Sequence, residues 1–393
     1  MPLKAEVVGR IADVDAREWD ALDPTGHPFT RHAFLEALEA TGCVGEDTGW
    51  IPAHLVVRDS RRGSARTVVA AVPQYLKTHS WGEFVFDWSW AQSYLRAGLD
   101  YYPKQLAAIP FTPVTGPRLL IEAGAAGFDE TDLRDELAGL LLETARRTGA
   151  SGAHVNFTLE DDQAALERAG FLRRHDCRFL WRNRGYRSFD EFLATFRADK
   201  RKKAKRERRK VAEAGITFRT LAGEAIDAEL WRVIFGFSER TFLRHGNGHY
   251  LSVDFLERVS RALPGCVMVK LAERAGRPVA ASIFFEGGGW LYGRYWGAAA
   301  PEDSLHFEAC YYQGIDYCIE RGLQCFDPGT QGEHKIARGF EPARTLSAHW
   351  LEHAGFRAAV ARYLERERDA IDAYIADSSE HVPYQRETAG ADA

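Results

Sequence analysis

The sequence predicts an α/β protein, with mixed central sheets flanked by helices, that is built from two copies of one unit. The first observation is a helical stretch, a glycine and a short apolar strand in that order. This series occurs as ETARRTGASGAHVNF in the first half and as DYCIERGLQCFD in the second. The second observation is a β-hairpin pattern ahead of each series, over residues 54–77 and 266–286. A repeated order of elements indicates a duplicated unit.

The length of the chain agrees with a two-domain organisation, because 393 residues are enough for two sizeable hydrophobic cores. We place the boundary near residue 184. The expected domains are residues 1–184 and 185–365, followed by a helical or flexible tail over 366–393.

In the first half, apolar spacing and turn residues predict each element. Phe34, Leu35 and Leu38 recur at helical spacing. The three prolines of PFTPVTGP predict a rigid loop, since proline suits neither a helix interior nor a central strand. The expected elements are a helix over 29–41, hairpin strands over 54–59 and 67–77, an aromatic-rich stretch over 84–102, the loop over 110–117, a helix over 133–148, and strands over 154–159 and 179–183.

The second half is expected to follow the same plan. A run of apolar and aromatic residues over 290–296 ends at Gly297, which predicts a strand that breaks into a loop. The expected elements are helices over 189–215 and 230–243, hairpin strands over 266–273 and 278–286, the strand over 290–296, a helix over 306–321, and a buried strand over 323–326. We expect the last two strands to lie side by side.

Composition excludes several classes of protein. The net charge of −5 means that any nucleic-acid role must come from a local basic patch. The six cysteines show no CxxC spacing, and the histidines and acids show no paired ligand spacing, so we expect no metal. The N-terminus has no apolar core typical of a signal peptide, and no apolar run reaches the roughly 18–20 residues that span a bilayer. We therefore expect a cytoplasmic protein with reduced thiols.

A basic helix is the strongest charge feature. Residues 197–210 contain ten Lys or Arg residues, opposed only by Asp199 and Glu207. Like charges spaced by four residues destabilise a helix, and a phosphate-rich partner relieves that repulsion. The partner can be tRNA, a nucleotide-linked precursor or CoA; the alternative is a merely solvated charged helix. The residues expected to hold the donor are Lys200, Lys202, Lys203, Lys205, Arg206 and Arg209.

Three stretches carry a resemblance to a known family. They are ADKRKKAKRERRKVAEAGITF (198–218), the segment from YGRYWGAAA to EHKIARGF (292–340), and FDWSWAQSYLRAGLDYYPKQLAAIPFTPVTGP (86–117). The order of hairpin, strand, long helix and strand resembles the GNAT fold of N-acetyltransferases. The doubled form resembles the FemAB-like transferases, which attach amino acids to peptidoglycan precursors. Within that family, the third stretch resembles predicted N-acyltransferases described as peptidoglycan biosynthesis or recognition proteins.

The candidate site is a polar cluster in a loop just after the strand over 323–326, containing Asp327, Gln331, Glu333, His334, Lys335 and Arg338. Acyl transfer to an amine requires a proton acceptor and a group that stabilises an oxyanion. Glu308, Asp327, His334 and Asp87 are the candidate catalytic residues, although Glu308 and Asp327 can instead serve as helix caps or ion-pair partners. The residues expected to bind substrate are Lys335, Arg338, Arg294, Tyr292, His306 and Trp88.

The donor is inferred from a missing motif. CoA-dependent members of this fold hold pyrophosphate on a Q/R-x-x-G-x-G/A loop at a helix start. The corresponding segments here, GAAAPEDSLHFEA and TPVTGPRLLIEAG, lack the pattern, and the first places acids where phosphate would lie. We therefore expect transfer of an aminoacyl group from aminoacyl-tRNA, without a cofactor, to an amine of a small molecule or a peptidoglycan precursor. The alternatives are an acyl-CoA donor, or a module that binds precursor or RNA without catalysis.

Overall fold

The computed structural model describes residues 3–62, 67–124, 127–330 and 332–385, and its contacts divide the chain into two compact units. Unit 1 comprises Met1–Asp176, Tyr250–Phe255 and Arg344–Asp372, and unit 2 comprises Cys177–His249, Leu256–Ala343 and Ala373–Ala393. This division differs from the single boundary expected near residue 184, because two later segments of the chain return to unit 1.

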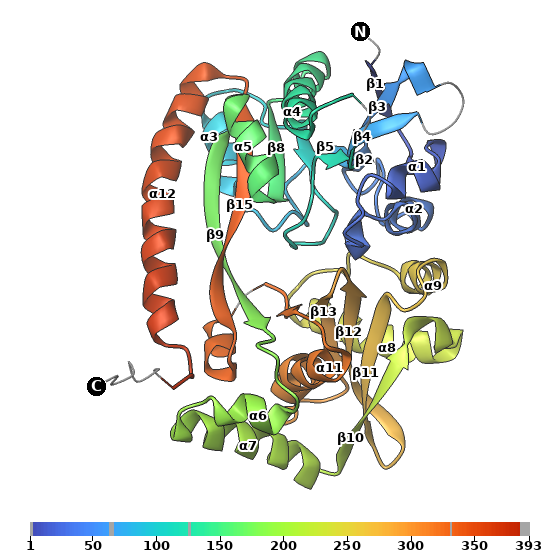
Figure 1. Cartoon of the computed structure of the whole chain (residues 1–393), viewed down its shortest axis with the longest axis vertical. Coiled ribbons are helices and arrows are strands. Elements are labelled where there is room, and N and C mark those ends of the chain that lie inside the picture. Colours follow the sequence, from blue (N-terminus) through green and yellow to red (C-terminus); the bar gives the residue numbers. More distant parts are fainter. Residues whose placement is uncertain (1–2, 63–66, 125–126, 331, 386–393) are drawn as a thin grey trace. The chain divides into compact units, whose positions relative to one another are not determined.

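Unit 1 contains a small antiparallel sheet with the strand order β1-β3-β4-β7, of which Figure 1 labels β1, β3 and β4. Its strands are β1 (Leu3–Val8), β3 (His54–Asp59), β4 (Val68–Val72) and β7 (Leu120–Ile121). The pairing of β3 with β4 confirms the expected hairpin, whose turn over 63–66 lies outside the described residues. After Pro73, however, the chain enters β5 (Gln74–Lys77), which belongs to a second sheet.

The second sheet of unit 1 has the strand order β9-β15-β8-β6-β5-β2. Its other strands are β2 (Trp50–Pro52), β6 (Lys104–Ala107), β8 (Gly152–Thr158), β9 (Leu172–Arg182) and β15 (Glu341–Leu351). Strands β6 and β8 run parallel, whereas β8 pairs with β15 in the antiparallel sense. Strands β9 and β15 continue into unit 2.

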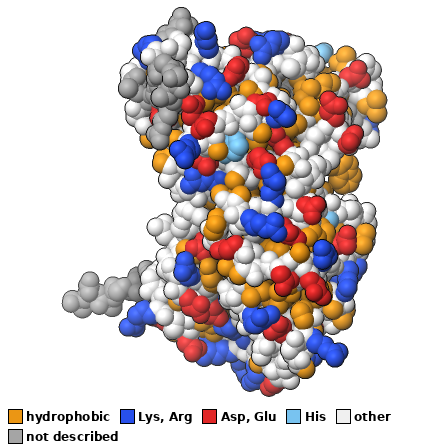
Figure 2. Space-filling model, turned by 90° about the vertical axis from the view of Figure 1, so that its right-hand side faces the viewer, with side chains coloured by type: hydrophobic (Ala, Val, Ile, Leu, Met, Phe, Trp, Pro, Cys, Tyr) orange, Lys and Arg blue, Asp and Glu red, His pale blue; other side chains and the backbone are white. Residues whose placement is uncertain are grey.

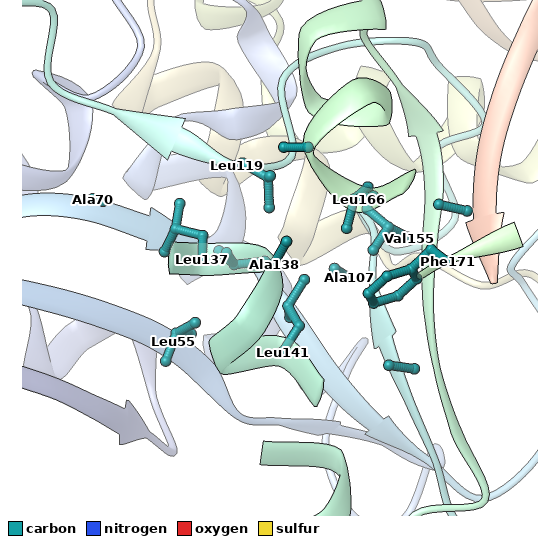
Figure 3. Close-up of a cluster of buried hydrophobic side chains, with 14 of the residues drawn as sticks. Leu55, Ala70, Ala107, Leu119, Leu137, Ala138, Leu141, Val155, Leu166 and Phe171 are labelled. Atoms are coloured by element: carbon teal, nitrogen blue, oxygen red, sulfur yellow. The ribbon is translucent and has the colours of Figure 1, made fainter. Parts of the chain in front are cut away.

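The hydrophobic core of unit 1 packs against helix α4 (Glu130–Arg147). Leu137 and Leu141 of that helix join Leu55, Ala70 and other buried side chains of the strands (Figure 3). Burying such side chains contributes roughly 1.5–3 kcal/mol each. The helices are α1 (Ala16–Asp20), α2 (His32–Ala40), α3 (Trp88–Arg96), α4 (Glu130–Arg147), α5 (Glu160–Arg168) and the first part of α12 (Ala354–Glu380).

Unit 2 is built on one sheet with the order β10-β11-β12-β13-β14-β9. Its strands are β10 (Ile216–Ala222), β11 (Val267–Arg274), β12 (Arg277–Gly287), β13 (Trp290–Ala298) and β14 (Cys325–Asp327), with the end of β9. Strands β11 and β12 form the expected hairpin, and β13 runs parallel to β14. The prediction that the strands β13 and β14 lie side by side is therefore confirmed.

The helices of unit 2 correct two expectations. The helix expected over 189–215 is two helices, because the helical conformation is interrupted between Ala194 and Ala198. The helix expected over 306–321 is interrupted by a π-helical turn, Glu308–Tyr312. The helical elements are α6 (Phe189–Ala194), α7 (Ala198–Glu213), α8 (Ala228–Arg244), most of α9 (Val253–Ala262), α10 (Leu305–Phe307), α11 (Gln313–Arg321), the 3-10 helix η6 (Glu333–Arg338) and the end of α12.

Two surface properties complete the description. None of the described helices combines the length and apolar character needed to cross a bilayer. On the face that Figure 2 shows, Lys and Arg side chains are interspersed with Asp and Glu, so that face carries no field of a single sign. The helical tail expected over 366–393 is helical as far as Glu380, and residues 386–393 lie outside the described part of the chain.

Candidate functional site

The parallel strands β13 and β14 place the first candidate residues in unit 2. Tyr292 and Asp327 are paired in register across the two strands, and both side chains are buried. Asp327 is the last residue of β14, so its carboxylate stands where the strand gives way to a loop. Loops at the ends of parallel strands are the usual position for binding groups in α/β proteins.

Asp327 is held by a buried ion pair. Arg178 of β9 donates to the carboxylate of Asp327, and the exposed fractions of the two side chains are 7% and 1%. The second carboxylate oxygen accepts a hydrogen bond of 3.1 Å from the backbone N–H of Gly329. These partners fix the carboxylate at the start of the loop. Asp327 is therefore an ion-pair residue in this structure, which is the alternative to a catalytic role that the sequence analysis left open.

Lys335 lies in the same loop as a buried ammonium. Its residue exposure is 1%, and Nζ donates a hydrogen bond of 2.5 Å to the carbonyl oxygen of Gly329. Burial lowers the pKa of Lys335 to about 8, although the nearby Asp327 carboxylate acts in the opposite direction. Among the described residues, no carboxylate forms an ion pair with Lys335, and a buried cation of this kind is able to bind an incoming negative charge that replaces its lost solvation.

His334 of the same loop forms an aromatic cluster with His306 and Tyr311. The hydroxyl of Tyr311 and Nε2 of His334 share a hydrogen bond of 2.8 Å, while the His306 ring stands 5.3 Å from the Tyr311 ring. Burial, and then the positive charges of Arg338 and Lys335, lower the pKa of His334. Burial also lowers the pKa of His306 to about 4. Both imidazoles are therefore neutral at pH 7, and a neutral imidazole can accept a proton.

The π-helical turn Glu308–Tyr312 directs two consecutive tyrosines to different partners. Tyr311 reaches His334, whereas the Tyr312 hydroxyl donates to Glu207 of α7 at 2.6 Å. A regular helix turns successive side chains by a fixed angle, and single π turns often mark functional sites because they break that spacing. Tyr311 of this turn thus contacts the His334 ring through its hydroxyl.

The side chain of Arg338 is buried and is bonded to other residues of the protein. Its guanidinium donates to Glu207 at 2.8 Å and to the backbone carbonyl of His334 at 2.6 Å. The same group lies 3.4 Å from the centre of the Phe307 ring. These contacts anchor η6 to α7, so Arg338 is placed to position the loop that carries Lys335.

Glu308 has a buried position but no free carboxylate oxygen. Arg208 of α7 donates to both of its oxygens at 3.1–3.2 Å, and Gln313 donates at 2.8 Å. Arg208 also binds Asp316 at 2.6 Å. Burial raises the pKa of Glu308, and the Arg208 charge offsets part of that effect. Glu308 is thus an ion-pair partner in this structure, which was the alternative considered from sequence.

The basic helix α7 has an inner and an outer face. Ala204, Glu207 and Val211 are buried, and Arg208 turns toward Glu308. Of the expected donor-binding residues, Lys200 is half-buried and the others are exposed: Lys202, Lys203, Lys205, Arg206 and Arg209. Within the described chain, no ion pair involves Lys202 or Lys203, whereas Lys205 pairs with the exposed Asp190. The outer face therefore remains cationic.

Asp87 and Trp88 belong to unit 1 and are described separately. Asp87 accepts hydrogen bonds from the buried Lys104 and from the Tyr101 hydroxyl. Burial favours the neutral acid, but Lys104 and the other donors outweigh it and hold the pKa of Asp87 well below its usual range. A carboxylate held in its ionised form is a weak base, which reduces the case for Asp87 as a proton acceptor. Trp88 begins α3 and is 39% exposed.

The remaining candidates are less informative. Arg294 is half-buried on β13, with its guanidinium 5.7 Å from the centre of the Tyr295 ring. Glu333 accepts a hydrogen bond of 3.0 Å from the Tyr374 hydroxyl, and Gln331 lies outside the described residues. Among the residues that the structure describes, no group of three or more His, Cys, Asp or Glu side chains could hold a metal ion.

The fold and these residues define a class of protein, namely a tandem pair of GNAT-like α/β units. The FemAB-like family model, described as peptidoglycan biosynthesis/recognition, matches residues 10–386. The chain therefore belongs to the FemAB-like family. This membership confirms the resemblance stated from sequence and, with it, the class of enzyme, an acyltransferase.

Two solved structures have the same fold. The crystal structure of FemX is 12% identical with a TM-score of 0.53, and the match covers 88% of this chain and 98% of that one. The C-terminal domain of a putative lysylphosphatidylglycerol synthetase from Agrobacterium fabrum is 12% identical with a TM-score of 0.52, covering 89% and 95%. No protein with a curated description matches the chain significantly.

Several residues of the site were not predicted. Glu207 and Arg208 were counted only as part of a charged run, yet Ala204, Glu207, Arg208 and Val211 follow the spacing of one helix face. That spacing, with its two apolar members, was the available signal. Arg178, Tyr311 and Lys104 offered no such signal, because their partners Asp327, His334 and Asp87 are distant in sequence.

Proposed function

We propose that the chain transfers an aminoacyl group from aminoacyl-tRNA to an amine of a small molecule or a cell-wall precursor, with the chemistry in unit 2. The family description, peptidoglycan biosynthesis/recognition, supports an acceptor from the cell wall. The name of one structural relative, lysylphosphatidylglycerol synthetase, describes the joining of an amino acid to a lipid, which supports an aminoacyl donor. An aminoacyl-tRNA donor implies a cytoplasmic enzyme.

The buried ammonium of Lys335 carries the proposal. The acceptor amine attacks the ester carbonyl of the donor, a C–N bond forms, and the carbonyl oxygen becomes negative. Lys335, at 1% exposure and beside the end of β14, is suited to stabilise that oxygen or to bind an anionic group of the acceptor. When the tetrahedral intermediate collapses, the ester C–O bond breaks and the ribose hydroxyl leaves. Removing a comparable oxyanion donor costs about 10²–10³ in rate.

A proton must pass from the attacking amine to the leaving oxygen. Among the four expected catalytic residues, Glu308, Asp327 and Asp87 each accept hydrogen bonds from a buried or half-buried cation. His334 instead shares a hydrogen bond with Tyr311 and pairs with no charged group among the described residues, and its lowered pKa leaves the imidazole neutral at pH 7 and able to take up a proton. We therefore assign the proton transfer to His334, with Tyr311 as the residue that positions its ring.

The distribution of charge on α7 and at two helix starts supports the donor assignment. The exposed cations of α7 suit the phosphodiester backbone of a tRNA. At the start of α10, in contrast, Asp303 pairs with Lys210 at 2.5 Å, and Glu302 pairs with Arg274. Helix α4 is capped by Asp129, whose side chain accepts from the N–H of Thr131. Acids at both helix starts oppose a pyrophosphate there, which supports tRNA rather than CoA.

The donor can be tested directly. The full chain is incubated with a mixture of tRNAs charged with labelled amino acids and with candidate amine acceptors, in the presence and absence of RNase. We expect labelled amide only when the RNA is intact. In parallel, calorimetry with CoA and acetyl-CoA should show no binding tighter than about millimolar, equivalent to roughly −4 kcal/mol.

Two results would change the assignment. Micromolar binding of an acyl-CoA, with amide formation that survives RNase, would establish the alternative CoA-dependent N-acyltransferase. Tight binding of RNA or precursor, without product from any donor, would instead establish a non-catalytic binding module on this fold.

A further inference from the structure

A short segment of unit 1 exposes an unusual amount of apolar surface. Five side chains, which we call the α3 surface, are exposed by the following fractions: Trp81 54%, Phe86 59%, Trp88 39%, Leu95 76% and Leu99 39%. These are half of the exposed large apolar side chains in the described part of the chain, although they come from fewer than twenty consecutive residues. Single exposed apolar residues are ordinary, whereas a concentration of them marks an interaction site.

Four of the five side chains of the α3 surface lie around or beside one groove, whereas Phe86 lies apart, next to Arg174. The rings of Trp81 and Trp88 meet edge to face with their centres 5.1 Å apart. Trp88, Leu95 and Leu99 then border an open groove of about 660 Å³. Tyr101 and Tyr102 form part of its lining, and their hydroxyls point into the protein, toward Asp87 and Ser80 respectively. The groove is therefore lined largely by aromatic faces and aliphatic groups, with Ser89, Gln92 and Asp100 as its polar members.

Two of the three acids of this segment are turned inward. Glu83 and Asp87 are buried at 4% and 2% exposure, and Lys104 of β6 binds both carboxylates and the Ser80 hydroxyl. The charged residues left on the outside of residues 80–102 are Arg96 and Asp100, of opposite sign. Burying two carboxylates and a lysine is costly unless they are well paired. The arrangement keeps the outer surface free of net negative charge while holding the segment firmly on the sheet.

We propose that the α3 surface docks onto the interfacial region of a lipid bilayer. Tryptophan is enriched at the boundary between headgroups and acyl chains, and a helix with an exposed apolar face lies in that plane. The absence of net negative charge among the outer residues of this segment suits the anionic leaflet, which repels acidic surfaces. Trp81 and Trp88 lie at headgroup depth, and the Leu95 and Leu99 side chains enter the acyl layer. This proposal is independent of the donor and of the reaction.

Vesicle flotation tests the proposal. The full chain is mixed with vesicles of phosphatidylcholine alone, and with vesicles containing phosphatidylglycerol, at low and high salt. We expect the protein to float with both, and binding to survive high salt because apolar burial is not screened. The W81Q/L95Q double variant should lower the partition coefficient by more than about tenfold, since it removes two large exposed apolar side chains from the surface.

Matched controls keep the test decisive. Leu243 in unit 2 and Leu159 in unit 1 are exposed at 62% and 41%, so L243Q and L159Q remove similar apolar area elsewhere. These variants should float like the unchanged chain, and all variants should keep its melting temperature. Failure to float with either vesicle, or equal losses in the control variants, would overturn the proposal. A concentration-dependent dimer that only the double variant abolishes would also overturn it, because the α3 surface would then bind a second copy of the chain.

Discussion

Arg338 and Glu207 form a buried ion pair that joins the loop carrying Lys335 to the basic helix α7. Nη2 of Arg338 lies 2.8 Å from Oε1 of Glu207, and the exposed fractions of the two side chains are 3% and 9%. The Tyr312 hydroxyl donates to the other carboxylate oxygen of Glu207 at 2.6 Å. One carboxylate therefore holds together α7, the π-helical turn and η6, the three elements around the candidate site.

The first prediction concerns the stability that this pair provides. Glu207→Gln removes the charge and leaves Arg338 buried without its counter-ion, so we expect the free energy of unfolding to fall by about 3–5 kcal/mol. Urea unfolding measures this change. Glu257 pairs with Arg261, which is 72% exposed, so Glu257→Gln is a matched control and should cost under about 1 kcal/mol. Equal effects of the two substitutions would contradict the assigned role of Glu207.

The second prediction separates two roles for Glu308. Because Arg208 binds both of its oxygens, Glu308→Gln should lower the free energy of unfolding by about 1–3 kcal/mol. Turnover, corrected for the folded fraction, should fall by less than about tenfold, since a general base contributes 10²–10⁴. A large loss of turnover with unchanged stability would instead make Glu308 the proton acceptor.

The third prediction follows from the low pKa of Lys335. In the folded chain this pKa is about 8, below the roughly 10.4 of an unfolded lysine, so the folded state disfavours the charged form. The resulting cost to stability is full below pH 8 and disappears as the pH rises from 8 toward 10.4. Lys335→Met should therefore raise the melting temperature at pH 7, and the gain should shrink at pH 10. Lys203→Met, at an exposed site, should show neither effect.

The same pKa predicts a limb in the pH profile of the reaction. If the ammonium form of Lys335 is the active one, turnover should fall as the pH rises through about 8. Lys335→Arg keeps a positive charge at every accessible pH, so this limb should disappear or move upward in any variant activity that remains. A limb that stays in place would assign it to another group.

A fourth prediction concerns the outer face of α7. Changing Lys202, Lys205 and Arg209 to Glu should weaken binding of tRNA and reduce the slope of log affinity against log salt by about 2–3. The melting temperature should stay close to that of the unchanged chain, because all three side chains are exposed. The matched control changes Arg232, Arg240 and Arg244 of α8, also exposed, to Glu. If affinity and salt slope do not change, α7 is only a solvated surface.

Much of the framework could be predicted from local patterns. The pairing of β13 with β14 follows from two short apolar runs linked by a helix, which is the usual crossover between parallel strands. The π-helical turn could not be predicted, because residues 306–321 have ordinary helical spacing and the bulge depends on partners outside that helix. The inward position of Glu207 required knowing which face of α7 is buried.

The candidate site was only partly predictable for a related reason. The sequence located Asp327, His334 and Lys335 in one loop, which the register and hydrogen bonds of the structure bring together. It could not show that Arg178 neutralises Asp327 or that Lys104 neutralises Asp87, since both cations come from other strands. A carboxylate's suitability as a base depends on such distant partners more than on its neighbours in sequence.

The most direct test of the central claim is a single-turnover transfer assay with aminoacyl-tRNA and an amine acceptor, comparing the unchanged chain with Lys335→Met and with Lys4→Met, at an exposed lysine of unit 1 outside the proposed donor and acceptor sites. We expect amide formation by the unchanged chain and by the Lys4 variant at similar rates. The rate for Lys335→Met should be about 10²–10³-fold lower despite a stable fold. Equal rates for both variants would contradict the assignment of the chemistry to the Lys335 loop of unit 2.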